Sequence, residues 1–222
     1  MRALIRFGKR SRLRFISHLD LQRFFQRAVN RTGLPIAYTQ GFNPHPVMSF
    51  ASALALGWTS EYEVIDIKLS APMGRNRTED AVRAALPEDL PVLEVRMVED
   101  RHPAPMALVR MSDYEIALEG PDAPAVVAQI PAFLERTRVP AMKKTKSGEK
   151  EIDARPMVVA MEATEDGFAA RLMLTESQSI KPELLVGLLS DMAGVEPPPC
   201  RVHRTRLLGY DDMGQPKPLM EL

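Results

Sequence analysis

The first half of the chain is built from short apolar patterns whose spacing changes from that of a strand to that of a helix. Apolar and polar residues alternate over residues 2–7, which predicts a strand. Ser17 then begins a helix, because its hydroxyl can cap the first backbone N–H groups while Asp20, three positions later, completes a capping box. Gly33 and Pro35 end this helix. It is the best-specified element of the sequence.

The remaining patterns repeat one order of elements. We expect extended pieces at residues 36–38 and 47–51, a strand at 62–69, a helix at about 78–86 and a strand at 92–98. After a proline-containing connector at 99–105, we expect a strand at 114–118, a helix at 124–136, a hairpin of 152–163 and 168–175, a helix at 182–192 and a strand at 201–208. The order β-α-β-β-α-β therefore occurs twice. It predicts an α+β protein of two tandem ferredoxin-like units with antiparallel sheets, the first over 1–102 with the FISHLD and GFNPHP motifs and the second over 107–222.

The composition is that of an ordinary soluble protein. The chain has 222 residues, of which 45% are hydrophobic and 26% charged, and it is long enough to bury a proper core. No apolar run approaches the roughly 18 residues of a membrane span, and the chain opens on a strand pattern instead of a signal peptide, so we expect a cytoplasmic location. Cys200 is the single cysteine, which excludes an internal disulfide and a multi-thiolate cluster within this chain.

The charged residues are unevenly distributed along the chain, although the formal net charge is zero. The first 60 residues contain nine basic residues and one acidic residue, Asp20, and carry a formal charge of +8. Residues 61–222 therefore carry −8. A neutral protein with this distribution can present a strongly basic face to a polyanion.

Three arginines follow one stripe of the first predicted helix. Arg23, Arg27 and Arg31 lie on the stripe that begins at Asp20, while the apolar residues of the helix turn to a different face. A guanidinium donates two parallel hydrogen bonds to phosphate oxygens, so the stripe is suited to a nucleic-acid backbone. A solvated helix face with an Asp20–Arg23 ion pair is the alternative. Four basic residues just before the helix strengthen the first interpretation: Lys9, Arg10, Arg12 and Arg14.

The loop GFNPHP, residues 41–46, has the composition of a recognition site. Gly41 permits unusual backbone angles, and two prolines restrict the segment around His45. Phe42 could stack on a base, and Asn43 or His45 could read its edge. In the alternative interpretation Phe42 fills the core and His45 only bonds a backbone carbonyl.

Candidates for chemistry are few. His18 and His45 could act as base and acid in RNA cleavage, but His18 and Asp20 lie two apart in a helix and point away from each other, so a metal site is not expected. We expect no cofactor in this chain, which lacks a P-loop, a dinucleotide fingerprint, a nucleophile elbow and HExxH.

A lysine-rich turn at 142–153 is a further candidate contact to a nucleic-acid backbone. The candidate nucleic-acid-binding residues are Arg12, Arg14, Arg23, Arg27, Arg31, Phe42, Asn43, His45, Lys143, Lys144 and Lys146.

Several runs of the sequence resemble a known bacterial family. They are GKRSRLRFISHLDLQRFFQRAVNRTGLPIAYTQGFNPHP, LALGWTSEYEVIDIKL, GEKEIDARP and VHRTRLLGY, and together they span nearly the whole chain. These runs are similar to the radical-SAM-linked family, whose members carry a domain of unknown function and are encoded beside, or fused to, a radical SAM protein. Since a radical SAM enzyme needs three cysteines and this chain has only Cys200, the resemblance implies the standalone partner. Proximity of the family to ribonuclease and ribosomal protein genes makes RNA the implied substrate of the pair.

The sequence therefore predicts an RNA-binding accessory protein that works with a separate radical SAM enzyme, in tRNA or rRNA modification, and is not itself an enzyme. Two alternatives stay open. One is a metal-independent RNA endonuclease that uses His18 and His45, since repeat-associated RNA-processing proteins of CRISPR systems also pair two ferredoxin-like units. The other is a protein that docks only on the radical SAM enzyme, through its basic face.

Overall fold

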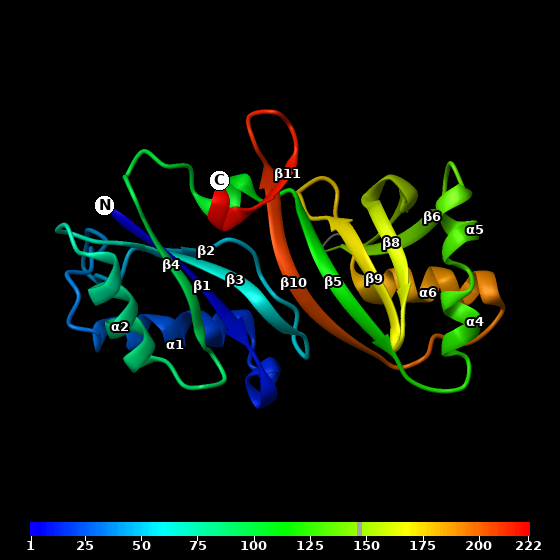
Figure 1. Ribbon diagram of the computed structural model, residues 1–222, viewed down its shortest axis with the longest axis horizontal. Helices are drawn as coiled ribbons and strands as arrows, with labels where there is room; N and C mark the ends of the chain where they lie inside the picture. The colour runs from blue at the N-terminus through cyan, green and yellow to red at the C-terminus, as the bar shows by residue number, and fades with distance from the viewer. Residues whose placement is uncertain (146–147) are drawn as a thin grey trace. The chain divides into compact units, whose positions relative to one another are not determined.

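The first strand lies in the middle of a sheet, which explains why so much of it is apolar. In a computed structural model that describes residues 1–145 and 148–222, only two residues of β1 (Arg2–Lys9) are partly exposed, Arg2 and Arg6. β1 pairs antiparallel with β3 (Thr59–Lys68) on one side and with β4 (Val92–Val98) on the other. The short β2 (Met48–Phe50) pairs antiparallel with β3 (Figure 1). The protein is thus of mixed α+β type with a mostly antiparallel sheet.

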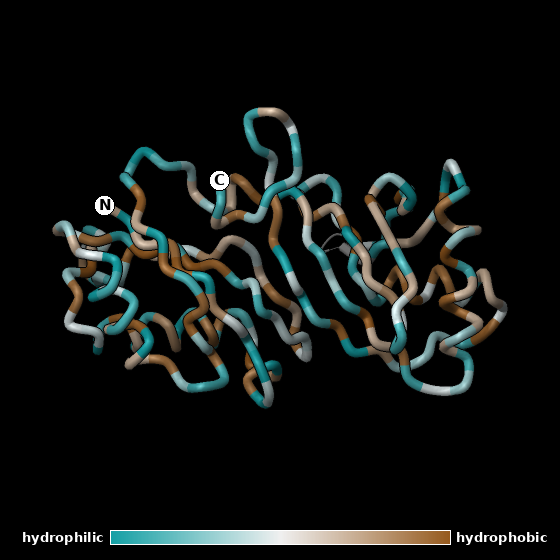
Figure 2. The backbone as a smooth tube through the Cα atoms, in the orientation of Figure 1, coloured by the Kyte–Doolittle hydropathy of each residue, from teal (hydrophilic) through white to brown (hydrophobic). Residues whose placement is uncertain are grey.

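Two helices pack on one face of this sheet. α1 (His18–Asn30) follows the 3-10 helix η1 (Ser11–Phe15), and α2 (Arg75–Ala85) follows β3. Buried side chains of both helices join those of the strands in one cluster that includes Phe7, Phe25, Phe50 and Val82. In Figure 2 the hydrophobic residues of this part of the chain follow its strands.

The cap predicted for the first helix is confirmed. The Ser17 hydroxyl oxygen accepts a hydrogen bond from the backbone N–H of Asp20, at 3.1 Å. The hydroxyl also donates to the Asp20 carboxylate at 2.7 Å, so Asp20 contacts the Ser17 side chain, whereas a capping box uses the backbone N–H of the first residue. The helix ends at Asn30, and Gly33 takes a left-handed conformation with a φ of 67°.

The chain divides into two compact units. Unit 1 comprises Met1–Val109 and Arg206–Leu222, and unit 2 comprises Arg110–Thr205. β10 (Cys200–Tyr210) supplies residues 200–205 to unit 2 and residues 206–210 to unit 1. This division differs from the expected ranges, 1–102 and 107–222, mainly in where the last residues of the chain belong.

Hydrogen bonds explain why the C-terminal segment joins unit 1. β11 (Pro216–Pro218) pairs with β10, and η3 (Leu219–Glu221) follows. The backbone N–H of Met220 donates to the hydroxyl of Tyr62 at 3.2 Å, and the Arg96 guanidinium donates to the carbonyls of Met220 and Leu222. These bonds join residues far apart in the sequence, so sequence order alone could not reveal them.

Unit 2 has its own antiparallel strands and helices. β5 (Met111–Leu118) pairs with β9 (Gly167–Met173), which pairs with β8 (Val158–Thr164). The strand order is β10-β5-β9-β8. α6 (Pro182–Ala193) packs against α4 (Ala123–Val127). The short η2 (Arg155–Met157) precedes β8.

Three local features of unit 2 differ from expectation. The strand expected at 152–163 is interrupted by η2, so that β8 begins only at Val158. The helix expected at 124–136 is divided into α4 and α5 (Ile130–Glu135), because Pro131 lacks an N–H and its ring cannot fit inside a continuous helix. The segment interpreted as a lysine-rich turn forms a two-stranded hairpin of β6 (Pro140–Thr145) and β7 (Gly148–Asp153). The alternation of apolar and polar residues that marks a strand is weak in β7, because most residues of β7 are exposed.

Gly167 provides a test of the β8–β9 connection. A Cβ atom at this position would lie 2.1 Å from the carbonyl oxygen of Ile116. We therefore expect Gly167→Ala to lower the free energy of unfolding, measured with denaturant, by about 1–3 kcal/mol. Gly187, in the middle of α6, is the control: nothing lies within 4 Å of its added Cβ, and Gly187→Ala should stabilise by up to about 1 kcal/mol. Equal effects of the two substitutions would contradict the described register.

Candidate functional site

The exposed face of α1 carries the predicted arginine stripe. Arg23, Arg27 and Arg31 are all exposed, whereas Leu21 and Phe25 of the same helix are buried. Arg23 pairs with Asp20 at 3.3 Å, as the solvated-face interpretation requires. This pair is exposed and contributes little to stability. Arg27 and Arg31 form no ion pair with the residues that the structure describes, so both guanidiniums are available to a ligand.

The GFNPHP loop lies next to the end of this stripe. The Tyr38 hydroxyl donates to the Asn30 side chain at 2.7 Å, which ties the start of the loop to the last residue of α1. A bridge between Tyr38 and Pro46 closes the loop at its base. Residues 41–45 are all exposed, so the loop and the end of the arginine stripe occupy neighbouring parts of the surface of unit 1.

The loop itself is held by local hydrogen bonds. The backbone N–H of Thr39 donates to the His45 carbonyl at 2.9 Å, and the His45 ring nitrogen Nδ1 lies 3.2 Å from the Thr39 hydroxyl. Gly41 has a φ of 123°, a conformation that other residues avoid. Phe42 is fully exposed, which excludes the alternative that it fills the core. His45 Nδ1 also lies 3.3 Å from the Asn43 carbonyl oxygen, as the alternative interpretation of His45 expects, so this residue is anchored within its own loop.

The basic residues before α1 divide into exposed and enclosed ones. The Arg12 side chain is 93% exposed, with Asp89 at 3.8 Å, and the Arg14 guanidinium lies over the Phe15 ring at 4.7 Å. Lys9, which the sequence places with the basic face, is instead 1% exposed. Its ammonium group donates to the carbonyls of Arg14 and Ile16 at 3.4 and 3.0 Å. Lys9 therefore holds η1 in place and is not a surface contact.

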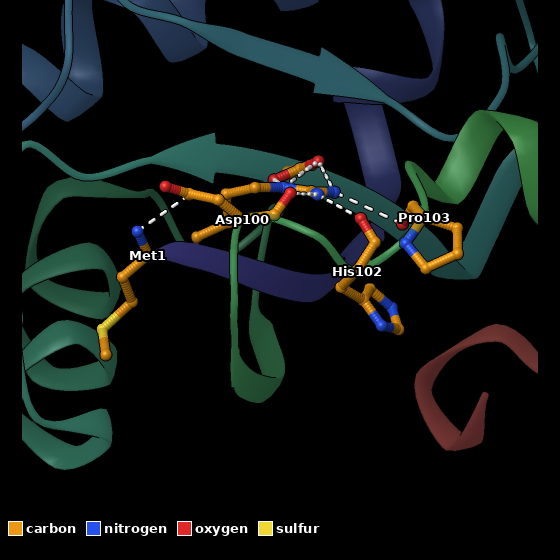
Figure 3. Close-up of polar contacts among 6 residues, drawn as sticks. Met1, Asp100, His102 and Pro103 are labelled. Atoms are coloured by element: carbon orange, nitrogen blue, oxygen red, sulfur yellow. Dashed lines mark hydrogen bonds and ion pairs between the residues drawn. The ribbon is translucent and has the colours of Figure 1, made fainter.

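A second enclosed basic residue, Arg2, fixes the connector that follows β4. The Arg2 guanidinium forms an ion pair with the Asp66 carboxylate at 2.6 Å and donates to the carbonyls of Asp100, His102 and Pro103 (Figure 3). These bonds hold the connector just before α3 (Pro105–Leu108). As a result α3 packs against β2 and β3 within unit 1.

A pocket of about 400 Å³ opens between α1, β2 and α3. Its walls are His18 and Gln22 from the first turns of α1, residues 48–53 from β2 and the segment after it, and Met106 from α3. All of these residues belong to unit 1. Of this set, the sequence predicts only His18 as a candidate. Gln22 shares the α1 face of His18 through i, i+4 spacing, but the contribution of Met106 depends on the long-range Arg2 contacts.

His18 is partly buried at the pocket wall. Its ring stands edge-on to the Phe50 ring, with centroids 5.2 Å apart. Burial lowers the pKa of His18, the nearby Lys9 charge lowers it further, and the buried Glu63 carboxylate partly opposes both. The imidazole is therefore neutral at pH 7, with one nitrogen able to donate and the other to accept a hydrogen bond.

The two histidines suggested for RNA cleavage occupy different settings. His18 lines the pocket, whereas His45 is held in the exposed loop and is not part of the pocket wall. Within the described residues, no group of three or more His, Cys, Asp or Glu side chains is arranged to hold a metal ion.

The single cysteine, Cys200, is partly buried, and burial raises the pKa of its thiol.

The lysines of the β6–β7 hairpin are only partly described. The Lys143 ammonium group donates to the Ser179 carbonyl and hydroxyl at 2.7 and 2.8 Å, so Lys143 has a structural role within unit 2. Lys144 lies on β6, and Lys146 lies outside the described residues.

The helices within residues 1–145 and 148–222 include none with the length and apolar character needed to span a bilayer.

Comparisons with known proteins identify the family. A family model described as an uncharacterized protein conserved in bacteria (DUF2344) matches residues 2–182. The chain belongs to this family. No curated protein matches it in sequence.

Among solved structures, the DUF2344 chain is similar to a chain in the crystal structure of a Cbf5–Nop10–Gar1 complex. The TM-score is 0.51 with 11% sequence identity, over 92% of this chain and 48% of the other. This chain therefore spans about half the length of the chain that it matches. At such low identity, the likeness concerns the fold alone.

The low pKa of His18 predicts a specific dependence of stability on pH. Since its pKa is lowered on folding from an ordinary value of 6.5, the unfolded chain binds the proton more tightly, and stability falls as the pH decreases through and below 6.5. His102 has a pKa shifted in the same direction, mainly by burial. We expect thermal unfolding of His18→Gln to vary less between pH 7.5 and 5.5 than that of the wild type. An identical pH profile for His18→Gln and the exposed-loop control His45→Gln would contradict this account.

Proposed function

We propose that this member of the DUF2344 family is an RNA-binding accessory protein that works with a separate radical SAM enzyme in tRNA or rRNA modification. Two ferredoxin-like units are part of the proposal. The pairings of unit 1 give the order β4-β1-β3-β2, and unit 2 has the order β10-β5-β9-β8. Both agree with the split β-α-β arrangement of that fold.

One observation carries the RNA part of the proposal: Arg27 and Arg31 are exposed without ion pairs in the described structure, beside a loop that presents a fully exposed aromatic ring, Phe42. The arginines offer planar donors to phosphates, and an exposed aromatic ring provides a surface on which an unpaired base can stack. A stacked base contributes about 1–3 kcal/mol to binding of a single strand. An isolated ring or an isolated charge would be ordinary surface, but together they offer RNA both a stacking surface and donors to its phosphates.

A different surface supports the part of the proposal that concerns a partner enzyme. Phe15 is exposed at the end of η1, Leu19 at the start of α1, and Leu56 in the loop after β2. The backbone N–H of Gly57 donates to the Arg14 carbonyl at 2.8 Å, which holds this loop beside η1. Exposed apolar residues on adjoining segments are typical of a protein-docking surface. The identity of the partner rests on the family resemblance.

The arginine stripe gives the first test of the proposed function. We expect Arg27→Ala/Arg31→Ala to weaken the binding of single-stranded RNA irrespective of its sequence, measured by fluorescence anisotropy over a range of salt concentrations. If both arginines contact phosphates, the slope of log K against log salt should become less steep by roughly 1.4. The matched control is Arg77→Ala/Arg101→Ala, which removes two other exposed arginines of unit 1. RNA binding that is equally strong and equally salt-dependent in both double variants would refute the proposed interface.

The docking surface gives an independent test. After nuclease treatment of a lysate from cells that express the tagged chain, the wild type should retain a protein with a CxxxCxxC motif. Leu19→Glu/Leu56→Glu should reduce its recovery by about tenfold or more, because burying a charge at the centre of an interface costs at least about 2 kcal/mol. Met213→Glu, at an exposed apolar residue of the β10–β11 loop, is the control. Retention of the same radical SAM protein by all three chains would show that this surface is not the contact.

A further inference from the structure

The pocket between α1, β2 and α3 is lined by apolar side chains together with polar side chains. Its volume of about 400 Å³ lies within the range of roughly 300–1,000 Å³ that is typical of small-molecule sites. Apolar groups come from Met48, Phe50 and Met106, and polar groups from His18, Gln22 and Ser49. None of the residues that line it is Lys, Arg, Asp or Glu. This lining suits a ligand whose entering part is uncharged and carries hydrogen-bonding groups.

The polar groups of the pocket are available to such a ligand. In the described part of the chain, no hydrogen bond engages the Gln22 amide, the Ser49 hydroxyl or the His18 ring nitrogens. Gln22 offers a donor and an acceptor side by side, and the neutral His18 imidazole offers one of each. An amide that presents both groups can form a bidentate pair with the edge of a heterocycle.

The apolar groups favour a flat ring. Thioethers make favourable contacts with aromatic rings, and Met48 and Met106 belong to different elements of the pocket wall. Phe50 lies within 5.4 Å and 6.1 Å of the Phe25 and Phe7 rings, measured between centroids, and is therefore firmly placed. The pocket is open to solvent at the exposed Met106.

We propose that this pocket binds a single unstacked nucleobase, with Gln22 and His18 reading its hydrogen-bonding edge and Met48 and Met106 contacting its faces. In the form that rests on the proposed function, the base belongs to the bound RNA. Gln22 directly precedes Arg23, and consecutive helix residues point roughly 100° apart, so α1 carries the base-reading side chains and the phosphate-binding arginines on adjacent faces. A free nucleoside would satisfy the same chemistry, and the test distinguishes the two sources.

The first arm of the test uses short fluorescent RNA homopolymers of A, C and U with the full chain. The wild type should prefer one base. Gln22→Ala should weaken binding of that homopolymer by about fivefold or more while leaving the salt slope unchanged, since a lost bidentate pair removes base discrimination and no phosphate contact. Ser49→Ala provides a second variant outside α1. Gln26→Ala is the matched control, because Gln26 lies one turn further along α1 and does not line the pocket.

The second arm uses free nucleosides, so that it does not depend on RNA binding. With methyl-labelled methionine, the resonances of Met48 and Met106 should shift when the preferred nucleoside is added, and Gln22→Ala should abolish the shift. If RNA binding responds to Arg27→Ala/Arg31→Ala but Gln22→Ala behaves like Gln26→Ala, the base pocket is wrong and the proposed function stands. If nucleosides shift both methionines but no RNA binds, the pocket is a site for free nucleosides and the proposed function falls. Failure of every base and nucleoside to engage the pocket overturns the inference.

Discussion

The contact among Phe7, Phe25 and Phe50 is the interaction on which unit 1 depends. The three rings come from β1, α1 and β2, and the Phe7–Phe25 and Phe25–Phe50 centroids lie 4.8 and 5.4 Å apart. Each such pair contributes about 0.5–1.5 kcal/mol beyond the burial of its area. Because Phe25 is fixed against the sheet, the rotation of α1 about its axis is fixed as well. The arginines of α1 must then face solvent.

The same contact determines the chemistry of the pocket. Phe50 supports the His18 ring, whose pKa is lowered mainly by burial, so a neutral imidazole faces the opening. Buried Lys9 bonds the backbone carbonyls of η1 and thereby holds the chain that enters α1. Arg2, which is paired with Asp66, donates to backbone carbonyls of the segment before α3 and holds this segment at the other side of the pocket. The candidate site is therefore a consequence of the packing of the core.

The sequence was informative where the cause of the structure is local. Ser17 and Asp20 predicted the start of α1, and the spacing of its arginines predicted the exposed stripe, because capping and periodicity depend on neighbours within one or two turns. It was not informative about Lys9, whose burial depends on β3 and on the carbonyls of η1, and it did not reveal that Met106 lines a pocket. Long-range packing decides such features, and a single sequence records them poorly. Pro131 is a local signal as well, and it accounts for the division of the expected helix into α4 and α5.

Ultraviolet crosslinking in living cells, followed by mass spectrometry of the RNA-linked peptides, would locate the surface of this protein that contacts RNA. We expect RNA-linked peptides that contain Phe42 or residues of α1, and a marked decrease in total crosslinked RNA in Arg27→Ala/Arg31→Ala. No RNA above the level of an untagged control, or RNA-linked peptides that come only from unit 2, would contradict the claim that the face formed by α1 and its neighbouring loop recognises RNA.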